Sequence, residues 1–479
     1  MPISAIESSI QILTQLVQDY AKQSVKKCEP LAQSGSHRRY FRLTLEDNNT
    51  LIGAFNDDVP ENIAFFTYTR FFLEKNVNVP RLLAIAPDNQ HYLQTDLGKT
   101  TLYDFLSAHR ENGQLSDEVI AYYEKVVRAL PTLQLSGKQG IDFSVAYPRA
   151  AFDRQSMQWD LNYFKYYFLK LVNIPFNEQL LENDYNTFID YLLSADSEYF
   201  LYRDFQSRNI MVDDGDVYFI DYQGGRKGAL QYDIASLLYD AKADLSPEFR
   251  DHLLSIYLDT LEQYIPVDRK AFLSYFQGFV LIRILQSMGA YGYRGYFERK
   301  SHFLLSVPYA IHNMRNLLDH LDIPIALPEL TKVLRTLIDS DFVKPYQPAK
   351  TLTVRVQSFS YKQSIPQDPS PNGGGFVFDC RALPNPGREP QYKTFTGKDQ
   401  CVQDYLNQYP AVHEFCSHVF AIVDQSVDNY LERHFDHLMV SFGCTGGQHR
   451  SVFFAEQTAK HIAQKYPGVK VILKHTAQE

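Results

Sequence analysis

The chain has 479 residues, of which 45% are hydrophobic, and this length and composition are typical of two or three folded domains. Its 47 basic and 56 acidic side chains give a net charge of −9 with no block of like charge, which argues against a basic segment that holds nucleic acid non-specifically. The N-terminus lacks a signal-peptide pattern, no apolar run reaches membrane-spanning length, and the five cysteines form no CxxC pair. We therefore expect a cytoplasmic protein without membrane contact, disulfide framework or structural zinc.

The first part of the chain shows two patterns. Short alternating runs predict the strands of a small antiparallel sheet at 39–45, 51–55 and 91–94, and a helix at 63–75 lies between the last two. From about Leu102 to about Leu321 the pattern changes to long helices, with the clearest at 117–130, 152–171 and 185–193. A single β-hairpin interrupts the helices, with strands at 209–212 and 217–221 around a turn that contains Gly215.

The residues around this hairpin carry the most informative chemistry. Asp204 lies on the preceding loop, Asn209 enters the first strand, and Asp221 ends the second strand. Phosphoryl transfer needs a carboxylate that orients or deprotonates the attacking hydroxyl, and oxygen ligands that hold Mg²⁺ against the phosphates. Because a hairpin returns Asn209 and Asp221 to the same place, this set can supply all three groups. The spacing therefore predicts a kinase.

The stretch Tyr-Arg-Asp-Phe-Gln-Ser-Arg-Asn at 202–209 resembles the catalytic loop H-x-D-x-x-x-x-N of the aminoglycoside-phosphotransferase and choline-kinase superfamily. The resemblance implies a catalytic base at Asp204, metal ligands at Asn209 and Asp221, and ATP and Mg²⁺ as cofactors. This chain has Tyr202 where the family usually has His, at a position of packing and orientation. Asp233 stands in a motif whose Asp supports the catalytic loop, and read alone it is an ordinary helix N-cap.

The residues expected to contact the nucleotide differ from the family pattern. Ser34, Gly35 and Ser36 lie where a phosphate-covering loop is expected, and residues 95–97 correspond to the hinge that receives adenine, with Thr95 and Leu97 as nucleotide contacts. The lysine expected on the strand at 51–55 is missing, so we expect Arg39, Arg42 or additional metal charge to neutralise the nucleotide. A pseudokinase is the alternative, but the intact Asp204, Asn209 and Asp221 favour an enzyme.

The lysine-less strand and the sequence Ser-His-Arg-Arg-Tyr-Phe-Arg at 36–42 resemble one branch in particular, the anomeric kinases for N-acetylmuramate and N-acetylglucosamine. This resemblance implies an amino-sugar acceptor in cell-wall sugar recycling. By residue type, Trp159 offers a stacking face, and Asp160 and Arg226 offer hydrogen bonds to hydroxyls. A half-buried core aromatic remains an equal interpretation of Trp159.

The last part of the chain has a different organisation. Residues 322–350, with four prolines around one short helix, are predicted to be a linker. Strands at 352–357, 376–379, 438–443 and 469–474 alternate with helices at 411–434 and 451–465, which indicates α/β layers. The strand at 438–443 leads through Cys444, Thr445, Gly446, Gly447, Gln448, His449 and Arg450 directly into a helix. Converging backbone N–H groups, the helix dipole and the His-Arg pair predict an anion pocket there.

Two resemblances compete for this pocket. Cys444-x5-Arg450 matches the signature of tyrosine phosphatases, with Cys444 as a thiolate nucleophile. A longer match, which includes 377–386, 396–399 and 443–451, resembles the C-terminal domain of RapZ, an RNase adaptor that senses glucosamine-6-phosphate. This second resemblance implies ligand contacts at Cys444, Thr445, Gly446, Gly447, His449 and Arg450, and residue type adds Arg381.

The sequence thus predicts an α+β, protein-kinase-like domain of two lobes followed by a smaller α/β domain. The expected boundaries are 1–96 for the first lobe, 97–321 for the second, 322–350 for the linker and 351–479 for the anion-binding domain. The expected partners are a small sugar and a phosphosugar or other anion, without nucleic acid. A regulatory adaptor that binds nucleotide and phosphosugar, and a kinase with a phosphatase domain, are the alternative functions.

Overall fold

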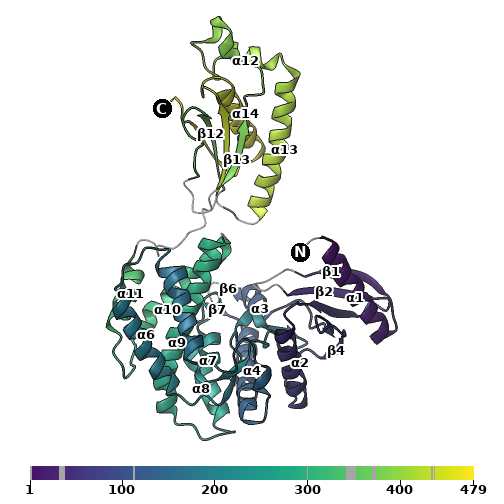
Figure 1. Cartoon of the computed structure of the whole chain (residues 1–479), viewed down its shortest axis with the longest axis vertical. Helices are drawn as coiled ribbons and strands as arrows, with labels where there is room; N and C mark the ends of the chain where they lie inside the picture. Colours follow the sequence, from purple (N-terminus) through teal and green to yellow (C-terminus); the bar gives the residue numbers. More distant parts are fainter. Residues whose placement is uncertain are drawn as a thin grey trace. The chain divides into compact units, whose positions relative to one another are not determined.

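The computed structural model describes residues 3–31, 38–111, 114–298, 300–340, 352–368, 374–432, 435 and 437–478 (Figure 1). The chain divides into two compact units, Met1–Lys344 and Pro345–Glu479. The first unit has the two-lobed fold of protein kinases and the second is a parallel α/β domain, as the sequence predicts.

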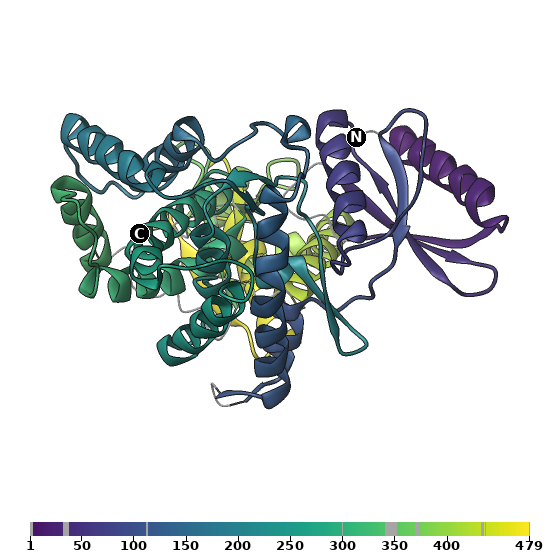
Figure 2. The ribbon, with the colours of Figure 1, turned by 90° about the horizontal axis from the view of Figure 1, so that it is seen from below.

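The smaller lobe of the first unit is an antiparallel sheet with a helix on each side (Figures 1 and 2). Its strand order is β1-β2-β3-β5-β4, with β1 at Val25–Pro30, β2 at Arg39–Leu45, β3 at Thr50–Phe55, β4 at Leu82–Ile85 and β5 at His91–Thr95. Helix α1 (Ile3–Ala21) packs Leu13 and Val17 onto the sheet. Helix α2 (Val59–Glu74) begins four residues before its predicted start because Asp58 caps it by accepting from Glu61 N. The sequence pattern did not predict strands β1 and β4, because neither strand alternates apolar and polar residues.

The larger lobe is mostly helical. Its helices are α3 (Leu102–Ala108), α4 (Asp117–Leu135), α5 (Arg154–Phe164), α6 (Glu178–Leu193), α7 (Gln231–Leu238), α8 (Pro247–Leu261), α9 (Arg269–Gly292), α10 (Val307–Asp319) and α11 (Pro328–Asp339). Helix α9 packs against α5, α7 and α10 in the core of this lobe. The stretch Arg269–Phe297 is long and apolar enough to cross a membrane, but most of it is buried inside the protein, as in a core helix.

The predicted hairpin is confirmed. Strands β9 (Ile210–Asp213) and β10 (Asp216–Phe219) pair antiparallel, and the turn between them has positive φ at Asp214 and Gly215, as the tight hairpin turns require. Other short strands are β6 (Arg110–Glu111), β7 (Gln114–Leu115), β8 (Tyr199–Leu201) and β11 (Arg226–Gly228), and β8 pairs with β11.

The predicted linker at 322–350 is too long. Helix α11 buries Leu330, Val333, Leu334 and Leu337 in the core of the first unit. Its packing is reinforced by Asp184, which accepts from Leu330 N at 2.8 Å, and by Glu329, which accepts from Asn177 N at 2.8 Å. Pro328 therefore begins a core helix, and the residues through Asp339 belong to the first unit rather than to a linker.

The second unit is a four-stranded parallel sheet of order β13-β14-β12-β15. The strands are β12 (Thr353–Ser360), β13 (Gly375–Asp379), β14 (His437–Cys444) and β15 (Lys470–His475). Parallel strands need long crossovers, and helices α12 (Gln400–Asn407), α13 (Pro410–Glu432) and α14 (Arg450–Lys465) provide them. Of these three helices, only α12 was not predicted from the sequence. Because β14 ends at Cys444 and α14 begins at Arg450, the loop between them lies at the carboxyl end of the sheet.

Candidate active site and anion pocket

A cavity of about 690 Å³ lies in the first unit, between the sheet of the smaller lobe and the hairpin and α9 of the larger lobe. Asp204, Asn209 and Asp221 all line it, so the structure brings together the three residues that the hairpin spacing predicts. Thr95 and Leu97 line it as well, at the end of β5.

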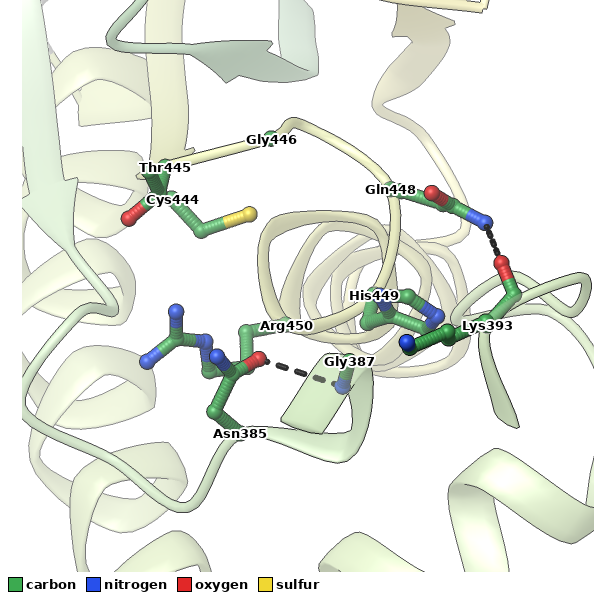
Figure 3. A pocket seen from close by; sticks show the side chains of 9 residues that line it. All are labelled: Asn385, Gly387, Lys393, Cys444, Thr445, Gly446, Gln448, His449 and Arg450. Carbon is green, nitrogen blue, oxygen red and sulfur yellow. Dashed lines mark hydrogen bonds between the residues drawn. The ribbon is translucent and has the colours of Figure 1, made fainter. Parts of the chain in front are cut away.

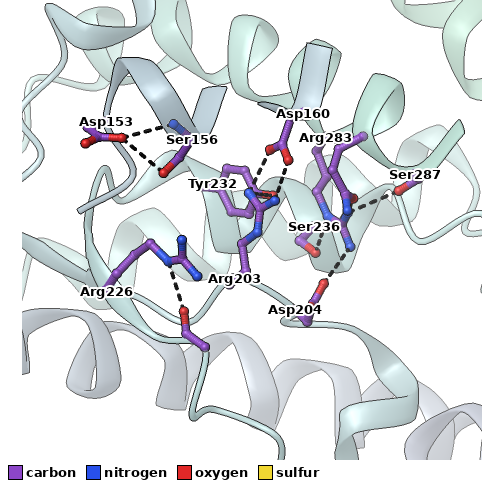
Figure 4. Close-up of polar contacts among 12 residues, drawn as sticks. Asp153, Ser156, Asp160, Arg203, Asp204, Arg226, Tyr232, Ser236, Arg283 and Ser287 are labelled. Atoms are coloured by element: carbon purple, nitrogen blue, oxygen red, sulfur yellow. Dashed lines mark hydrogen bonds and ion pairs between the residues drawn. The ribbon is translucent and has the colours of Figure 1, made fainter. Parts of the chain in front are cut away.

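Asp233 on α7 supports the loop at 202–209 through hydrogen bonds to its backbone. Its carboxylate accepts from Tyr202 N at 2.8 Å and from Arg203 N at 3.1 Å. Burial raises the pKa of Asp233 to about 7, although these backbone donors and Gln134 oppose the rise. Arg203 has a left-handed φ of 88°, which is strained for a side chain of this size. The ion pair of Arg203 with Asp160 has N–O distances of 2.6 and 2.8 Å (Figure 4). This pair and the Asp233 contacts together hold the conformation.

Asp204 is surrounded by positive charge. Arg283 on α9 places Nη2 3.5 Å from Asp204 Oδ1, and its Nε donates to Ser236 Oγ at 2.8 Å (Figure 4). Burial acts to raise the pKa of Asp204, but the guanidinium groups of Arg283, Arg203, Arg208 and Arg226 outweigh it and lower that pKa below its ordinary value. Asp204 is therefore ionised at neutral pH, the state in which a carboxylate orients or accepts the proton of a hydroxyl.

Asn209 and Asp221 form an oxygen-donor pair. Ile220 N donates to Asn209 O at 3.1 Å, which places the two ends of the hairpin side by side. The Asn209 amide nitrogen donates to Asp204 O at 2.8 Å, so its amide oxygen is the atom available to a cation. Burial raises the pKa of Asp221, and the like charge of Asp204 adds to the rise, while Gln223 and Arg38 oppose it. Two such donors together with nucleotide phosphates fit the ligand requirements of Mg²⁺. The described residues contain no group of three or more His, Cys, Asp or Glu that could hold a metal.

Of the two arginines expected to replace the strand lysine, Arg42 lines the cavity. Arg42 Nε and Nη2 donate to the Asp96 carboxylate oxygens at 2.6 and 2.9 Å, and Nη2 also donates to Gly98 O. Arg39 is not among the residues that line the cavity. Ser34, Gly35 and Ser36 lie outside the described residues.

The three expected sugar contacts lie outside the cavity lining. Both oxygens of Asp160 are engaged by Arg203, so this carboxylate supports the loop. Burial and the neighbouring charge of Arg203 lower the pKa of Arg226 to about 10, and its Nε donates to Gly224 O at 3.0 Å (Figure 4). The Trp159 ring is half exposed and lies 5.7 Å from the Arg149 guanidinium.

The second unit has a pocket of about 380 Å³ around the loop that follows β14 (Figure 3). It is lined by Asn385, Gly387, Lys393, Cys444, Thr445, Gly446, Gln448, His449 and Arg450. Gly447 N donates to Cys444 Sγ at 3.2 Å, and Ser451 Oγ lies 3.1 Å from the same sulfur. These contacts and Arg450 lower the pKa of the Cys444 thiol, although its burial acts in the opposite direction. Of the six contacts expected in this loop, Cys444, Thr445, Gly446, His449 and Arg450 line the pocket, and Gly447 does not.

Of the two arginines expected at the pocket, Arg450 lines it and Arg381 does not. Arg450 lines the pocket, but its Nη1 donates to Arg381 O at 2.8 Å and Leu383 O at 3.0 Å, so it also ties down the neighbouring loop. Its Nε is buried without a partner among the described residues. The Arg381 side chain points elsewhere, since it pairs with Asp379 and lies 4.1 Å from the ring of Tyr361. Arg381 is not a lining residue, because Asp379 holds its guanidinium.

Sequence reasoning missed three polar lining residues, Asn385, Lys393 and Gln448. Gln448 Nε2 donates to Lys393 O at 3.0 Å across 55 residues of sequence, and His449 contacts Tyr392 O at 2.9 Å. No local pattern marks Lys393, because tertiary packing alone brings it to the loop. None of the nine lining residues carries a carboxylate. Asp379 is paired with Arg381, and Asp399 accepts from Thr396, so neither lines the pocket.

The two-lobed fold and the loop that places Asp204 beside Asn209 and Asp221 define the first unit as a kinase-like phosphotransferase domain. The chain belongs to the phosphotransferase enzyme family, whose sequence pattern matches residues 27–267. Residues 352–479 match the RapZ C-terminal domain. Both broad resemblances that the sequence motifs indicate are thus confirmed.

Individual relatives match parts of the chain. A nucleotide-binding protein of Delftia acidovorans is 38% identical over 120 residues, which are 25% of this chain and 38% of that protein. One from an Acidovorax strain is 43% identical over 119 residues, 25% of this chain and 40% of that protein. The chain therefore spans about two fifths of the length of these relatives.

Solved structures of kinases are similar to the chain at low sequence identity. An ADP-bound aminoglycoside phosphotransferase gives a TM-score of 0.44 at 15% identity, covering 68% of this chain and 98% of that one. A choline kinase from Cryptosporidium parvum gives a TM-score of 0.46 at 12% identity, covering 69% of this chain and 99% of that one.

Proposed function

We propose that the first unit is an ATP- and Mg²⁺-dependent kinase that phosphorylates the anomeric hydroxyl of N-acetylmuramate or N-acetylglucosamine. The observation that carries the kinase part is the convergence of Asp204, Asn209 and Asp221 on one cavity. Asn209 and Asp221 would hold Mg²⁺, which would neutralise charge on the phosphates. Asp204, ionised and held by the loop contacts to Asp233, orients the attacking hydroxyl.

The choice of acceptor rests on the resemblance of residues 36–42 and of the lysine-less strand β3 to amino-sugar kinases, and the cavity is compatible with it. Its wall around the catalytic loop is polar, with Gln206, Arg208 and Gln223 beside Asp204. Hydroxyl and amide groups of a sugar need several such partners, because a buried polar group that loses its hydrogen bonds to water must be compensated.

We expect transfer to the anomeric hydroxyl in a panel of acceptors. With ATP and Mg²⁺, N-acetylmuramate or N-acetylglucosamine should be phosphorylated, whereas choline and an aminoglycoside should not. Phosphorus NMR of the product should show a phosphate coupled to the anomeric proton. Phosphate at the sixth carbon, or transfer only to choline or an aminoglycoside, would contradict this acceptor while leaving the kinase class intact.

For the second unit we propose binding of a sugar phosphate without hydrolysis. Lys393, His449 and Arg450 line a pocket into which the first turn of α14 opens, and cations and helix N-termini favour phosphate. Hydrolysis by a Cys444 thiolate would also need a general acid for the leaving group. The lining residues supply no carboxylate for this role.

Replacing Arg450 by Ala should weaken binding of glucosamine-6-phosphate by about 100-fold or more, because a charge-assisted donor is lost and the loop at 381–383 is released. Arg381→Ala is the matched control, since this arginine lies outside the pocket, and it should bind normally. Cys444→Ser should also retain binding. The measurement is calorimetry on the full chain carrying Asp204→Asn, which removes the proposed kinase activity.

The same proteins are incubated with a chromogenic phosphate ester. No release of phosphate is expected. Release that depends on Cys444 would establish the phosphatase function, and equal binding by the Arg450 and Arg381 variants would refute the proposed pocket. If no nucleotide turnover occurs with any acceptor while the second unit binds phosphosugar, the regulatory adaptor becomes the better description.

A further inference from the structure

Strand β3 lacks a cation where a kinase needs one. In protein kinases a lysine on this strand contacts the nucleotide phosphates and pairs with a glutamate on the following helix. Ile52 lines the cavity, and side chains two residues apart on a strand share a face, so Ala54 presents its methyl group to the same side. Ala54 is fully buried. The position next to the cavity that would suit a lysine is therefore occupied by alanine.

A cation lies just before the neighbouring strand and pairs with a residue that lines the cavity. Strands β2 and β3 pair antiparallel with Tyr40 opposite Ala54, and Tyr40 lines the cavity. Arg38 directly precedes β2, two residues before Tyr40, and is not itself a lining residue. Its guanidinium lies 5.8 Å from the centre of the Phe65 ring on α2.

Arg38 is anchored by the helix that follows β3. Its Nη2 lies 3.1 Å from Glu61 Oε2 and donates to Asn62 Oδ1 at 3.4 Å, both on α2. Glu61 also accepts from Asn56 at 2.7 Å and lines the cavity. The Arg38–Glu61 pair thus joins the same sheet and helix that a lysine–glutamate pair joins in kinases.

The Arg38 guanidinium lacks part of its hydrogen bonding. The Arg38 side chain is only 2% exposed, and its Nε and Nη1 are buried without a hydrogen-bond partner among the described residues. Unpaired buried donors, above all on a cation, are costly, and they occur where a ligand completes the site. The planar fork of arginine suits phosphate oxygens.

We propose that Arg38, held by Glu61, is the nucleotide-phosphate ligand that replaces the missing lysine of β3. This inference rests on the proposed use of ATP by the first unit. Arg42 lines the cavity, but Asp96 engages its guanidinium. Arg38 and Arg39 both lie outside the lining, and Arg38 is the one paired with the lining residue Glu61.

The test separates phosphate contacts from general effects on the site. Binding of Mg·AMP-PNP and of adenosine is measured by calorimetry for Arg38→Met and for the matched control Arg39→Met. Arg38→Met should weaken AMP-PNP binding by about 10- to 100-fold, the loss of a charge-assisted hydrogen bond, and should leave adenosine binding within about 2-fold. Arg39→Met should change neither. Retained adenosine binding also shows that the variant is folded.

A second pair of variants returns the cation to β3. Arg38→Ala should lose AMP-PNP affinity, and the double variant Arg38→Ala/Ala54→Lys should recover part of it. Equal weakening of both ligands by Arg38→Met, or no weakening of either, would overturn the proposal, as would a folded double variant without recovery. These binding assays need no sugar acceptor. They therefore test Arg38 even if the protein does not phosphorylate amino sugars.

Discussion

Replacing Asp204 by Asn is expected to lower phosphoryl transfer by about 10²–10⁴-fold, the usual contribution of a general base. The carboxylate is ionised because Arg283 and its neighbours outweigh the effect of burial, and an amide at the same place cannot accept the proton. The proposed metal ligands Asn209 and Asp221 are unchanged in this variant, so it should bind Mg·AMP-PNP as the unmodified protein does. The measurement is kcat with a saturating acceptor beside calorimetric binding of the nucleotide.

Asp214→Asn provides the matched control for this substitution. Asp214 lies in the exposed turn of the hairpin with a φ of 46°, a conformation that asparagine tolerates, so the control should retain full activity. Near-normal turnover of Asp204→Asn would remove the kinase assignment. A parallel loss of nucleotide binding would instead mean that Asp204 helps to hold the metal.

Replacing Asp233 by Ala is expected to abolish activity and to lower the free energy of unfolding by about 2–4 kcal/mol, since two backbone donors lose their acceptor. Tyr202 N and Arg203 N both donate to this carboxylate in the fully buried base of the loop. Without it the left-handed conformation of Arg203 loses one of its two supports, and Asp204 follows directly in sequence. Urea unfolding and turnover, measured on the same sample, check the two effects.

The control for this second variant is Asp233→Asn. An asparagine oxygen still accepts from the loop, so we expect a smaller loss of stability and measurable turnover. If Asp233→Ala were as stable and active as the unmodified protein, the support of the loop by α7 would be refuted. If it lost stability alone, the loop would be shown to hold its geometry without Asp233.

The sequence predicts local features well because backbone hydrogen bonding and side-chain periodicity determine them. Asp204, Asn209 and Asp221 lie within one loop and one hairpin, so their convergence follows from the pairing of β9 with β10. The loop at 444–450 is similarly local, since a strand end, glycines and a helix start lie in direct succession. Residue type was a weaker guide for Asp160, whose two oxygens are used by Arg203, 43 residues away.

The sequence by itself determined the two kinds of domain and the local form of the loops at 202–209 and 444–450. Only the tertiary structure decided which distant groups complete them. Arg283 reaches Asp204 across 79 residues, Lys393 joins a loop 55 residues later, and Arg38 meets Glu61 on the next helix. The helix at 328–339 likewise joined the core although its prolines indicated a linker. The physical reason is that such contacts depend on how whole strands and helices pack, which no pattern of neighbouring residues specifies.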